Sequence, residues 1–169
     1  MFIQLLAGTV LIILCVINHA LCLEVLRRRC KISSQNWDIR LPVMGHVVIM
    51  ILVVLGLFLA HTIESWIWAV FYWLAGETKN LSEAVYFSTV TFTTLGFGDV
   101  TLSENWRLTS SLQAVSGILL FGWSTAFLVS VRAFFWRKHG IGSHTPSYTD
   151  SAEGPENLSA PAQTPKSPE

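Results

Sequence analysis

Three long apolar segments restrict the fold of this chain more than any other feature. They cover residues 1–23, 43–74 and 108–135. A helix needs about 20 apolar residues to cross roughly 30 Å of hydrocarbon, so each segment is long enough to span a membrane. The chain is 51% hydrophobic and only 13% charged, which is typical of a small integral membrane protein. We therefore expect an all-α membrane protein with three transmembrane helices.

The first apolar segment could instead be a secretory signal peptide. Such a signal has a basic start, an apolar run of about 7–15 residues and a small-residue cleavage site. Here no basic residue precedes the run, the run is longer, and the sequence HALCLE offers no such site. We predict a retained first transmembrane helix over residues 1–26, with cleavage as the open alternative.

Basic residues gather in two places, and their positions predict the topology. They are Arg27, Arg28, Arg29, Lys31 and Arg40 after the first segment, and Arg132, Arg137 and Lys138 at the end of the third. Because cytoplasmic loops carry the excess of basic residues, residues 27–42 should form a cytoplasmic loop and the C-terminus should be cytoplasmic. The N-terminus then lies outside. We expect a multi-pass protein of the plasma membrane, with a bacterial cytoplasmic membrane as the host.

A shorter segment, LSEAVYFSTVTF at residues 81–92, lies between the second and third spans. Ser82 is a good N-cap with Glu83 in the first turn, which predicts a short helix. At 1.5 Å per residue, eleven residues of helix from Ser82 reach about 16 Å, half of the hydrocarbon core, so the helix enters the membrane and returns. The peptide TTLGFGDV that follows, residues 93–100, is then non-helical backbone at membrane depth, which only buried protein or an ion can satisfy.

The peptide TTLGFGD resembles the selectivity filter of potassium channels, in which the common pattern is TVGYGD. The longer stretch YFSTVTFTTLGFGDVT is similar to the pore loop of the small bacterial potassium-channel family and of two-pore-domain channels. The order of outer helix, pore helix, filter and inner helix also agrees, over residues 43–135. The resemblance implies a pore module at residues 43–139 that conducts K⁺ passively.

The resemblance assigns roles to individual residues. The ion path is lined by the carbonyls of Thr94, Leu95, Gly96, Phe97 and Gly98. The filter is supported by Thr93, Asp99 and Tyr86. Two departures are Leu95 in place of Val or Ile and Phe97 in place of Tyr, and they leave the strictness of K⁺ over Na⁺ selection open. K⁺ at these carbonyls is the expected metal, and we expect no cofactor.

A single pore loop provides one strip of carbonyls, whereas a filter surrounds its ion. A closed ring of four identical subunits meets that need, so a homotetramer is expected. The other expected partner is membrane lipid, and nothing suggests a nucleic acid.

His61 and Glu64 are polar residues three positions apart within the second apolar segment. A carboxylate in hydrocarbon costs roughly 2.5–3.5 kcal/mol on insertion scales, so the pair should face protein. The two side chains should hydrogen-bond each other or the pore helix; a pH-sensitive brace on the filter is the alternative. A zinc site is disfavoured because the pair alone lacks further ligands. His19 and Asn18 of the first helix should make helix-to-helix hydrogen bonds.

One stripe of the third long helix carries polar and small residues at helical spacing. It includes Gln113, Ser116, Leu120 and Ser124, which we expect to line the inner cavity. Close packing between helices is the alternative for this stripe. Gly117 and Gly122 are candidate gating hinges, or serve the same close packing.

A potassium-selective channel is the function that these features favour. A less selective monovalent cation channel and a non-conducting sensor or accessory subunit are the alternatives, and an enzyme that uses His61 and Glu64 is disfavoured. No helix carries arginine at every third position, so a voltage sensor is not expected. Residues 140–169 are rich in Pro, Ser, Thr and Glu and should form a disordered cytoplasmic tail.

Overall fold

The computed structural model of the chain describes residues 2–36 and 42–138, and the regular structure of these residues is all helical, with no strand among them. The four helices are α1 (Phe2–Asn36), α2 (Pro42–Leu74), α3 (Leu81–Phe92) and α4 (Arg107–Lys138). Three are long and apolar enough to cross a membrane, with spans Phe2–Cys30, Val47–Leu74 and Arg107–Phe134. The expected all-α membrane protein with three spanning helices and one short helix is confirmed.

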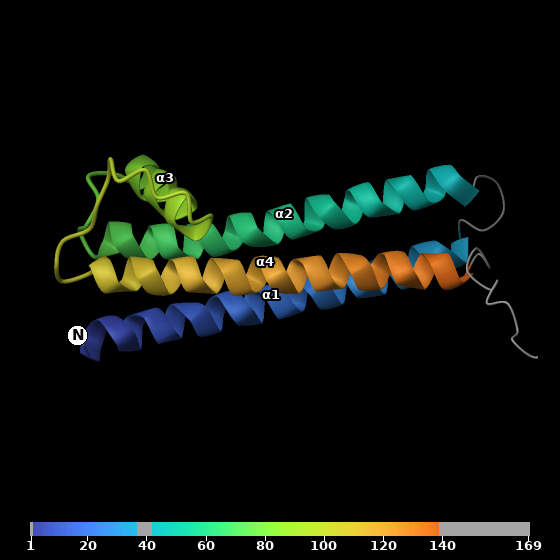
Figure 1. Ribbon diagram of the computed structural model, residues 1–169, viewed down its shortest axis with the longest axis horizontal. Coiled ribbons are helices and arrows are strands. Elements are labelled where there is room, and N and C mark those ends of the chain that lie inside the picture. Colours follow the sequence, from blue (N-terminus) through green and yellow to red (C-terminus); the bar gives the residue numbers. More distant parts are fainter. Residues whose placement is uncertain (1, 37–41, 139–169) are drawn as a thin grey trace, which may run out of the picture.

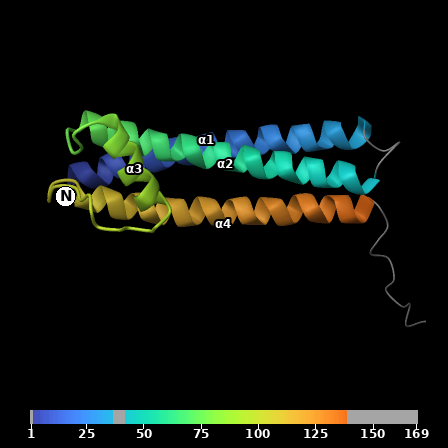
Figure 2. The ribbon, with the colours of Figure 1, turned by 90° about the horizontal axis from the view of Figure 1, so that it is seen from above.

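The three long helices lie side by side, and α2 runs opposite to α1 and α4 (Figures 1 and 2). Helix α3 folds back beside one end of the bundle, where it packs on α2 and α4 (Figure 1). Helix α1 packs along α2 and α4. The short helix therefore enters and leaves at the same end of the bundle, as a re-entrant segment must.

Helix α1 is longer than the sequence analysis expected. It continues to Asn36, so residues 27–36 of the predicted basic loop, residues 27–42, are helical. At 1.5 Å per residue its 35 residues reach about 52 Å, which exceeds the hydrocarbon core. On this end Glu24 forms ion pairs of 2.7 Å with Arg27 and Arg28, and such i, i+3 and i, i+4 pairs support an exposed helix end. The predicted tail, residues 140–169, lies outside the described residues.

Glycine ends α2, and asparagine begins α3. Gly76 has φ of +74°, its amide donates to Trp73 O, and the Glu77 amide donates to Tyr72 O, which is a Schellman C-cap. The N-cap of α3 is Asn80, whose side chain accepts a hydrogen bond from the Glu83 amide at 2.9 Å. The prediction of Ser82 as the cap is wrong, because the helix begins at Leu81 and is capped by Asn80, two residues before Ser82.

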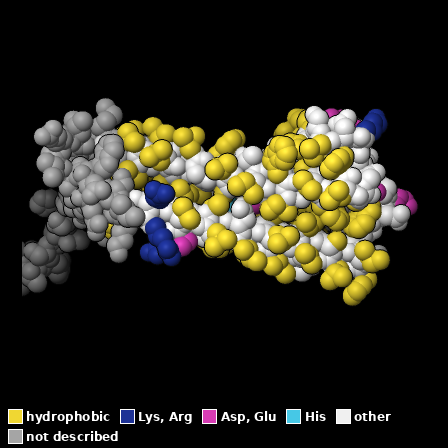
Figure 3. All heavy atoms as spheres, turned by 180° about the vertical axis from the view of Figure 1, so that it is seen from behind, with side chains coloured by type: hydrophobic (Ala, Val, Ile, Leu, Met, Phe, Trp, Pro, Cys, Tyr) yellow, Lys and Arg dark blue, Asp and Glu magenta, His cyan; other side chains and the backbone are white. Residues whose placement is uncertain are grey.

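The surface of the bundle is apolar over most of its length, and the basic side chains visible on it lie towards its two ends (Figure 3). Many large hydrophobic side chains of the three spans are exposed, among them Phe58, Leu59, Leu119 and Val129. Hydrocarbon is a suitable solvent for such a surface and water is not. The interior instead contains a core of Trp68, Tyr72, Phe87, Phe92 and Leu120 beneath α3, together with buried polar groups.

Candidate functional site

The peptide after α3 has an alternating backbone. Thr94, Gly96 and Gly98 have φ of +61°, +55° and +78°, whereas Leu95 and Phe97 between them are not in the positive-φ region. In an extended strand successive carbonyls point to opposite sides, but alternation of handedness aligns successive peptide groups. Glycine adopts positive φ freely, whereas Thr94 pays about 1–2 kcal/mol for it. Residues 94–98 therefore have the backbone that a strip of aligned carbonyls requires.

The amides at the base of this peptide are bonded to the end of α3. Leu95 and Gly96 both donate to Val90 O, at 2.9 and 3.3 Å, and Thr94 donates to Thr91 O at 2.9 Å. Within the described residues, no hydrogen bond ends on the carbonyl oxygens of residues 94–97. The negative end of the α3 dipole lies at the same place, so the free carbonyls and the helix end both favour a cation.

Two side chains fix the ends of the peptide. The Tyr86 hydroxyl of α3 donates to Asp99 Oδ2 at 2.7 Å, which ties the outer end of the peptide to the helix. This hydrogen bond lowers the pKa of Asp99 and raises the pKa of Tyr86. At the inner end, Thr93 Oγ1 donates to Thr89 O at 2.8 Å. Tyr86, Asp99 and Thr93 thus hold the peptide from both sides.

A chain of buried hydrogen bonds attaches α3 to its neighbours. The Tyr72 hydroxyl of α2 donates to Gln113 Oε1 of α4 at 2.9 Å, and Gln113 Nε2 donates to Ser88 Oγ at 2.7 Å. Ser88 in turn donates to Ser65 O at 2.6 Å. All four residues are buried, and a buried hydrogen bond that loses one partner costs about 1–3 kcal/mol. The short helix is therefore fixed on both long helices.

This network corrects the expected position of the α4 stripe. Its four residues are 0–6% exposed within a single chain, and they are Gln113, Ser116, Leu120 and Ser124. A side chain that lines a cavity has to be accessible in the isolated subunit, so the stripe packs against the chain's own helices instead. The alternative of close packing describes it, and the accessible face of α4 is the opposite one.

The two glycines of α4 have different surroundings. A Cβ at Gly117 would lie 2.1 Å from Phe92 O, so α4 touches the last residue of α3 backbone to backbone. A Cβ at Gly122 would have nothing within 4 Å. Gly117 therefore serves close packing at the base of the peptide, which accounts for it without a hinge.

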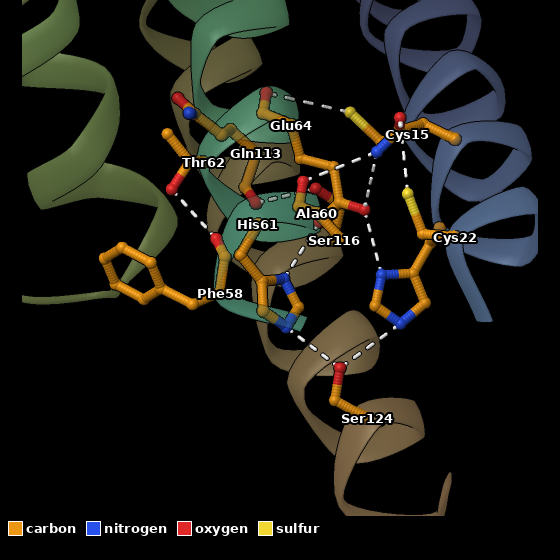
Figure 4. A network of polar contacts seen from close by, with 12 residues as sticks. Cys15, Cys22, Phe58, Ala60, His61, Thr62, Glu64, Gln113, Ser116 and Ser124 are labelled. Carbon is orange, nitrogen blue, oxygen red and sulfur yellow. Dashed lines mark hydrogen bonds and ion pairs between the residues drawn. The ribbon is translucent and has the colours of Figure 1, made fainter. Parts of the chain in front are cut away.

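A second polar group lies deeper in the bundle, where α1, α2 and α4 meet (Figure 4). Glu64 Oε1 and Oε2 lie 2.9 Å from His19 Nδ1 and His61 Nδ1 respectively. Ser124 Oγ lies 2.9 Å from His61 Nε2 and 3.2 Å from His19 Nε2, which closes a ring. We call His19, His61, Glu64 and Ser124 the His–Glu cluster. Asn18 extends it by donating to Glu64 Oε1 at 3.3 Å.

The cluster confirms part of the sequence analysis and extends it. The mutual hydrogen bond of His61 and Glu64 is confirmed, and so are the helix-to-helix hydrogen bonds of His19 and Asn18. The sequence did not show that His19 meets the pair. With it, three residues offer ligand atoms within 4.8 Å of one another, a set that could hold a metal ion. The available signal for His19 was its polarity within an apolar helix, but this polarity does not indicate which residue it contacts.

Comparison with known proteins agrees with this geometry. Residues 47–133, just over half of the 169-residue chain, match the family model described as an ion channel. No curated protein and no solved structure matches the chain. The matched range begins within α2 and ends within α4, so it contains α3 and the alternating peptide and omits α1. The chain therefore belongs to the ion channel family, which points to a channel rather than an enzyme, with a potassium-channel-like pore.

Proposed function

We propose that this channel is selective for K⁺ and conducts it passively through a filter formed by residues 94–98. The alternating backbone carries the proposal, because it aligns successive carbonyls that have no hydrogen-bond partner among the described residues. Carbonyl oxygens in this arrangement replace the hydration shell of a permeating cation. K⁺ is the permeant ion, and no further cofactor is needed.

The filter is completed by three further copies of the chain. One chain offers one strip of carbonyls, and its filter side chains are open: Leu95 is 60% and Phe97 65% exposed. Such exposure at membrane depth is relieved when neighbouring subunits cover it. A closed fourfold ring is the symmetric assembly that surrounds an ion on its axis, so a homotetramer in membrane lipid is the proposed state.

The accessible face of α4 lines the inner cavity of this assembly. It consists of residues that repeat at helical spacing and are exposed in the single chain, namely Val115, Leu119, Gly122, Ala126 and Val129. This face replaces the buried stripe as the proposed cavity lining. It is apolar, so water and hydrated ions would cross a cavity of hydrophobic character.

The proposed location is a bacterial cytoplasmic membrane, with the N-terminus outside and the C-terminus in the cytoplasm. The support for this orientation is charge, because Arg27 and Arg28 lie near the C-terminal end of α1 and Arg132 near that of α4. These helix ends lie at the end of the bundle opposite to α3 (Figure 1). Because basic residues favour the cytoplasmic side, α3 and the filter then open outward.

A substitution within the filter tests the conduction path. Gly96→Ala places a side chain at φ of +55°, where nothing lies within 4 Å but the backbone conformation itself is strained by about 1–2 kcal/mol. K⁺ flux into proteoliposomes should fall to background while the tetramer persists in detergent. Gly76→Ala is the matched control, because φ there is +74° with equal space, outside the filter. Undiminished flux in Gly96→Ala would contradict the proposed path.

The same liposomes distinguish the alternatives. Phe97 has no hydroxyl with which to tie the filter to its surroundings, and this observation favours a less selective monovalent cation channel as the second candidate. Equal flux under K⁺ and Na⁺ gradients would establish that candidate. No flux under either gradient, from a folded tetramer, would indicate a non-conducting sensor or accessory subunit.

A further inference from the structure

The His–Glu cluster lies where α1 meets the pore module, and none of its residues belongs to the peptide of residues 94–98. His19 and Glu64 are fully buried and Ser124 is 6% exposed. We propose that His19, His61 and Glu64 bind a divalent transition-metal ion of the zinc class. The site belongs to a segment that the ion channel match only partly covers, since His19 precedes residue 47.

The donor atoms are close enough for one ion. The two Nδ1 atoms each lie 2.9 Å from a Glu64 carboxylate oxygen, and the three ligand atoms are all within 4.8 Å of one another. On tetrahedral zinc, with bonds of about 2.0–2.1 Å, ligand atoms lie roughly 3.3 Å apart. Side-chain adjustments on the order of 1 Å bring the set to that spacing. Three protein ligands leave the fourth position for water.

The ring nitrogens that face away from the carboxylate already have the partner that metal-bound histidine requires. A ligating histidine donates its other N–H to an oxygen, which sets the orientation of the ring. Ser124 Oγ lies 2.9 and 3.2 Å from the two Nε2 atoms, and a hydroxyl oxygen has two lone pairs to accept both. Asn18 orients the carboxylate from the other side. Ser124 and Asn18 are therefore positioning residues.

The type of ligand selects the class of ion. Imidazole nitrogen suits Zn²⁺, Cu²⁺, Ni²⁺ and Fe²⁺, whereas Mg²⁺ and Ca²⁺ prefer all-oxygen sites. The cluster is therefore chemically distinct from the carbonyl filter. A divalent cation also offsets the charge of a carboxylate held within a membrane span, where an unpaired charge is costly.

Occupancy of this site links α1 to the base of the filter. His61 lies with its ring centroid 4.5 Å from that of Phe121 and 6.0 Å from that of Phe92, the last residue of α3. One ion bound by His19 of α1 and by His61 and Glu64 of α2 would hold the two helices together there. Bound metal thus stabilises the packing of the helices that contact the end of the pore helix α3.

Metal content of the purified tetramer tests the proposal. The full-length protein, free of any polyhistidine tag, is stripped with a chelator, titrated with Zn²⁺ and passed through gel filtration, and a parallel titration uses Co²⁺ absorption. We expect one ion per chain and a higher thermal unfolding temperature on saturation. Glu64→Gln and His19→Gln should lose the ion, and Ser124→Ala, which keeps all three ligands, should bind about 10–100-fold more weakly.

Glu24→Gln is the matched control, because it makes the same change on an exposed carboxylate that pairs with Arg27 and Arg28. It should bind Zn²⁺ like the unmodified chain. If Glu64→Gln fails to fold, His19→Gln and Ser124→Ala carry the test. Absence of bound ion in the unmodified protein would overturn the proposal and leave the cluster as a hydrogen-bonded ring only. Zn²⁺ binding by Ser124→Ala and His19→Gln that equals binding by the unmodified protein would overturn it as well.

Discussion

Gly117→Ala should damage the filter through a single added methyl group. The new Cβ would lie 2.1 Å from Phe92 O, and real Cβ contacts keep at least 3.0 Å, so one helix has to move by about 0.9 Å. The opposing atom is backbone at the end of α3, so no side-chain rotation relieves the contact. Thr93 and Thr94 follow directly, and the displacement is passed to the innermost residues of the filter.

The energetic cost can be separated from helix propensity by a second variant. Alanine in place of glycine stabilises a helix interior by about 1 kcal/mol, whereas overpacking costs about 1–3 kcal/mol. Gly122→Ala has the same propensity gain on the same helix and nothing within 4 Å of its Cβ. The difference between the two variants therefore isolates the overpacking cost, and Gly117→Ala should be the less stable by about 1–3 kcal/mol.

Denaturant unfolding of the protein in detergent, followed by tryptophan fluorescence, measures that difference, and K⁺ flux in liposomes measures its effect on the proposed filter. Gly117→Ala should lose most of its flux, and Gly122→Ala, which adds only one methyl group to the apolar face proposed to line the cavity, should keep it. Equal stability and equal flux in the two variants would refute the backbone contact as the reason for glycine at position 117. Loss of flux in Gly122→Ala alone would instead indicate that this position is a hinge.

Two further predictions concern the braces around α3. Gln113→Leu leaves the Tyr72 hydroxyl and Ser88 without their shared buried partner, so the free energy of unfolding measured in denaturant should fall by about 1–3 kcal/mol. A free energy of unfolding equal to that of the unmodified chain would contradict the network. Tyr86→Phe should lower the unfolding temperature in a pH-dependent way. The pKa of Asp99 is lowered, so the stability that its carboxylate contributes is full above the ordinary value of 3.8 and is lost as the pH falls through the lowered pKa. The pKa of Tyr86 is raised, so the stability that its hydroxyl contributes is full below 10.0 and is lost as the pH rises through the raised pKa. The difference between Tyr86→Phe and the unmodified protein should thus be greatest between about pH 4 and pH 10 and shrink outside this window, and a difference independent of pH would contradict the hydrogen bond.

Much of the fold could be predicted from local sequence alone. Length and apolar character are enough to identify a membrane-spanning helix, because hydrocarbon thickness sets the length needed. Twelve residues cannot cross, so α3 had to be re-entrant. The glycines of TTLGFGD indicated a backbone that other residues disfavour, and positive φ at Gly96 and Gly98 agrees. The i, i+3 spacing of His61 and Glu64 likewise predicted their contact.

The partners between helices could not be predicted, and the reason is the solvent. In a soluble helix the polar face marks water and the apolar face marks the core, but in a membrane helix lipid-facing and protein-facing positions are both apolar. From the sequence alone, the stripe that contains Gln113 fits a cavity lining as well as close packing, whereas in the structure it is buried against the other three helices. The meeting of His19 with Glu64, 45 positions apart, depends on how α1 and α2 pack, and so does the contact of Gly117 with Phe92 for α3 and α4. The sequence alone determined which segments cross the membrane and which one turns back. Only the packing of the helices decided which side chains meet inside the bundle, because those contacts depend on the relative rotation of each helix.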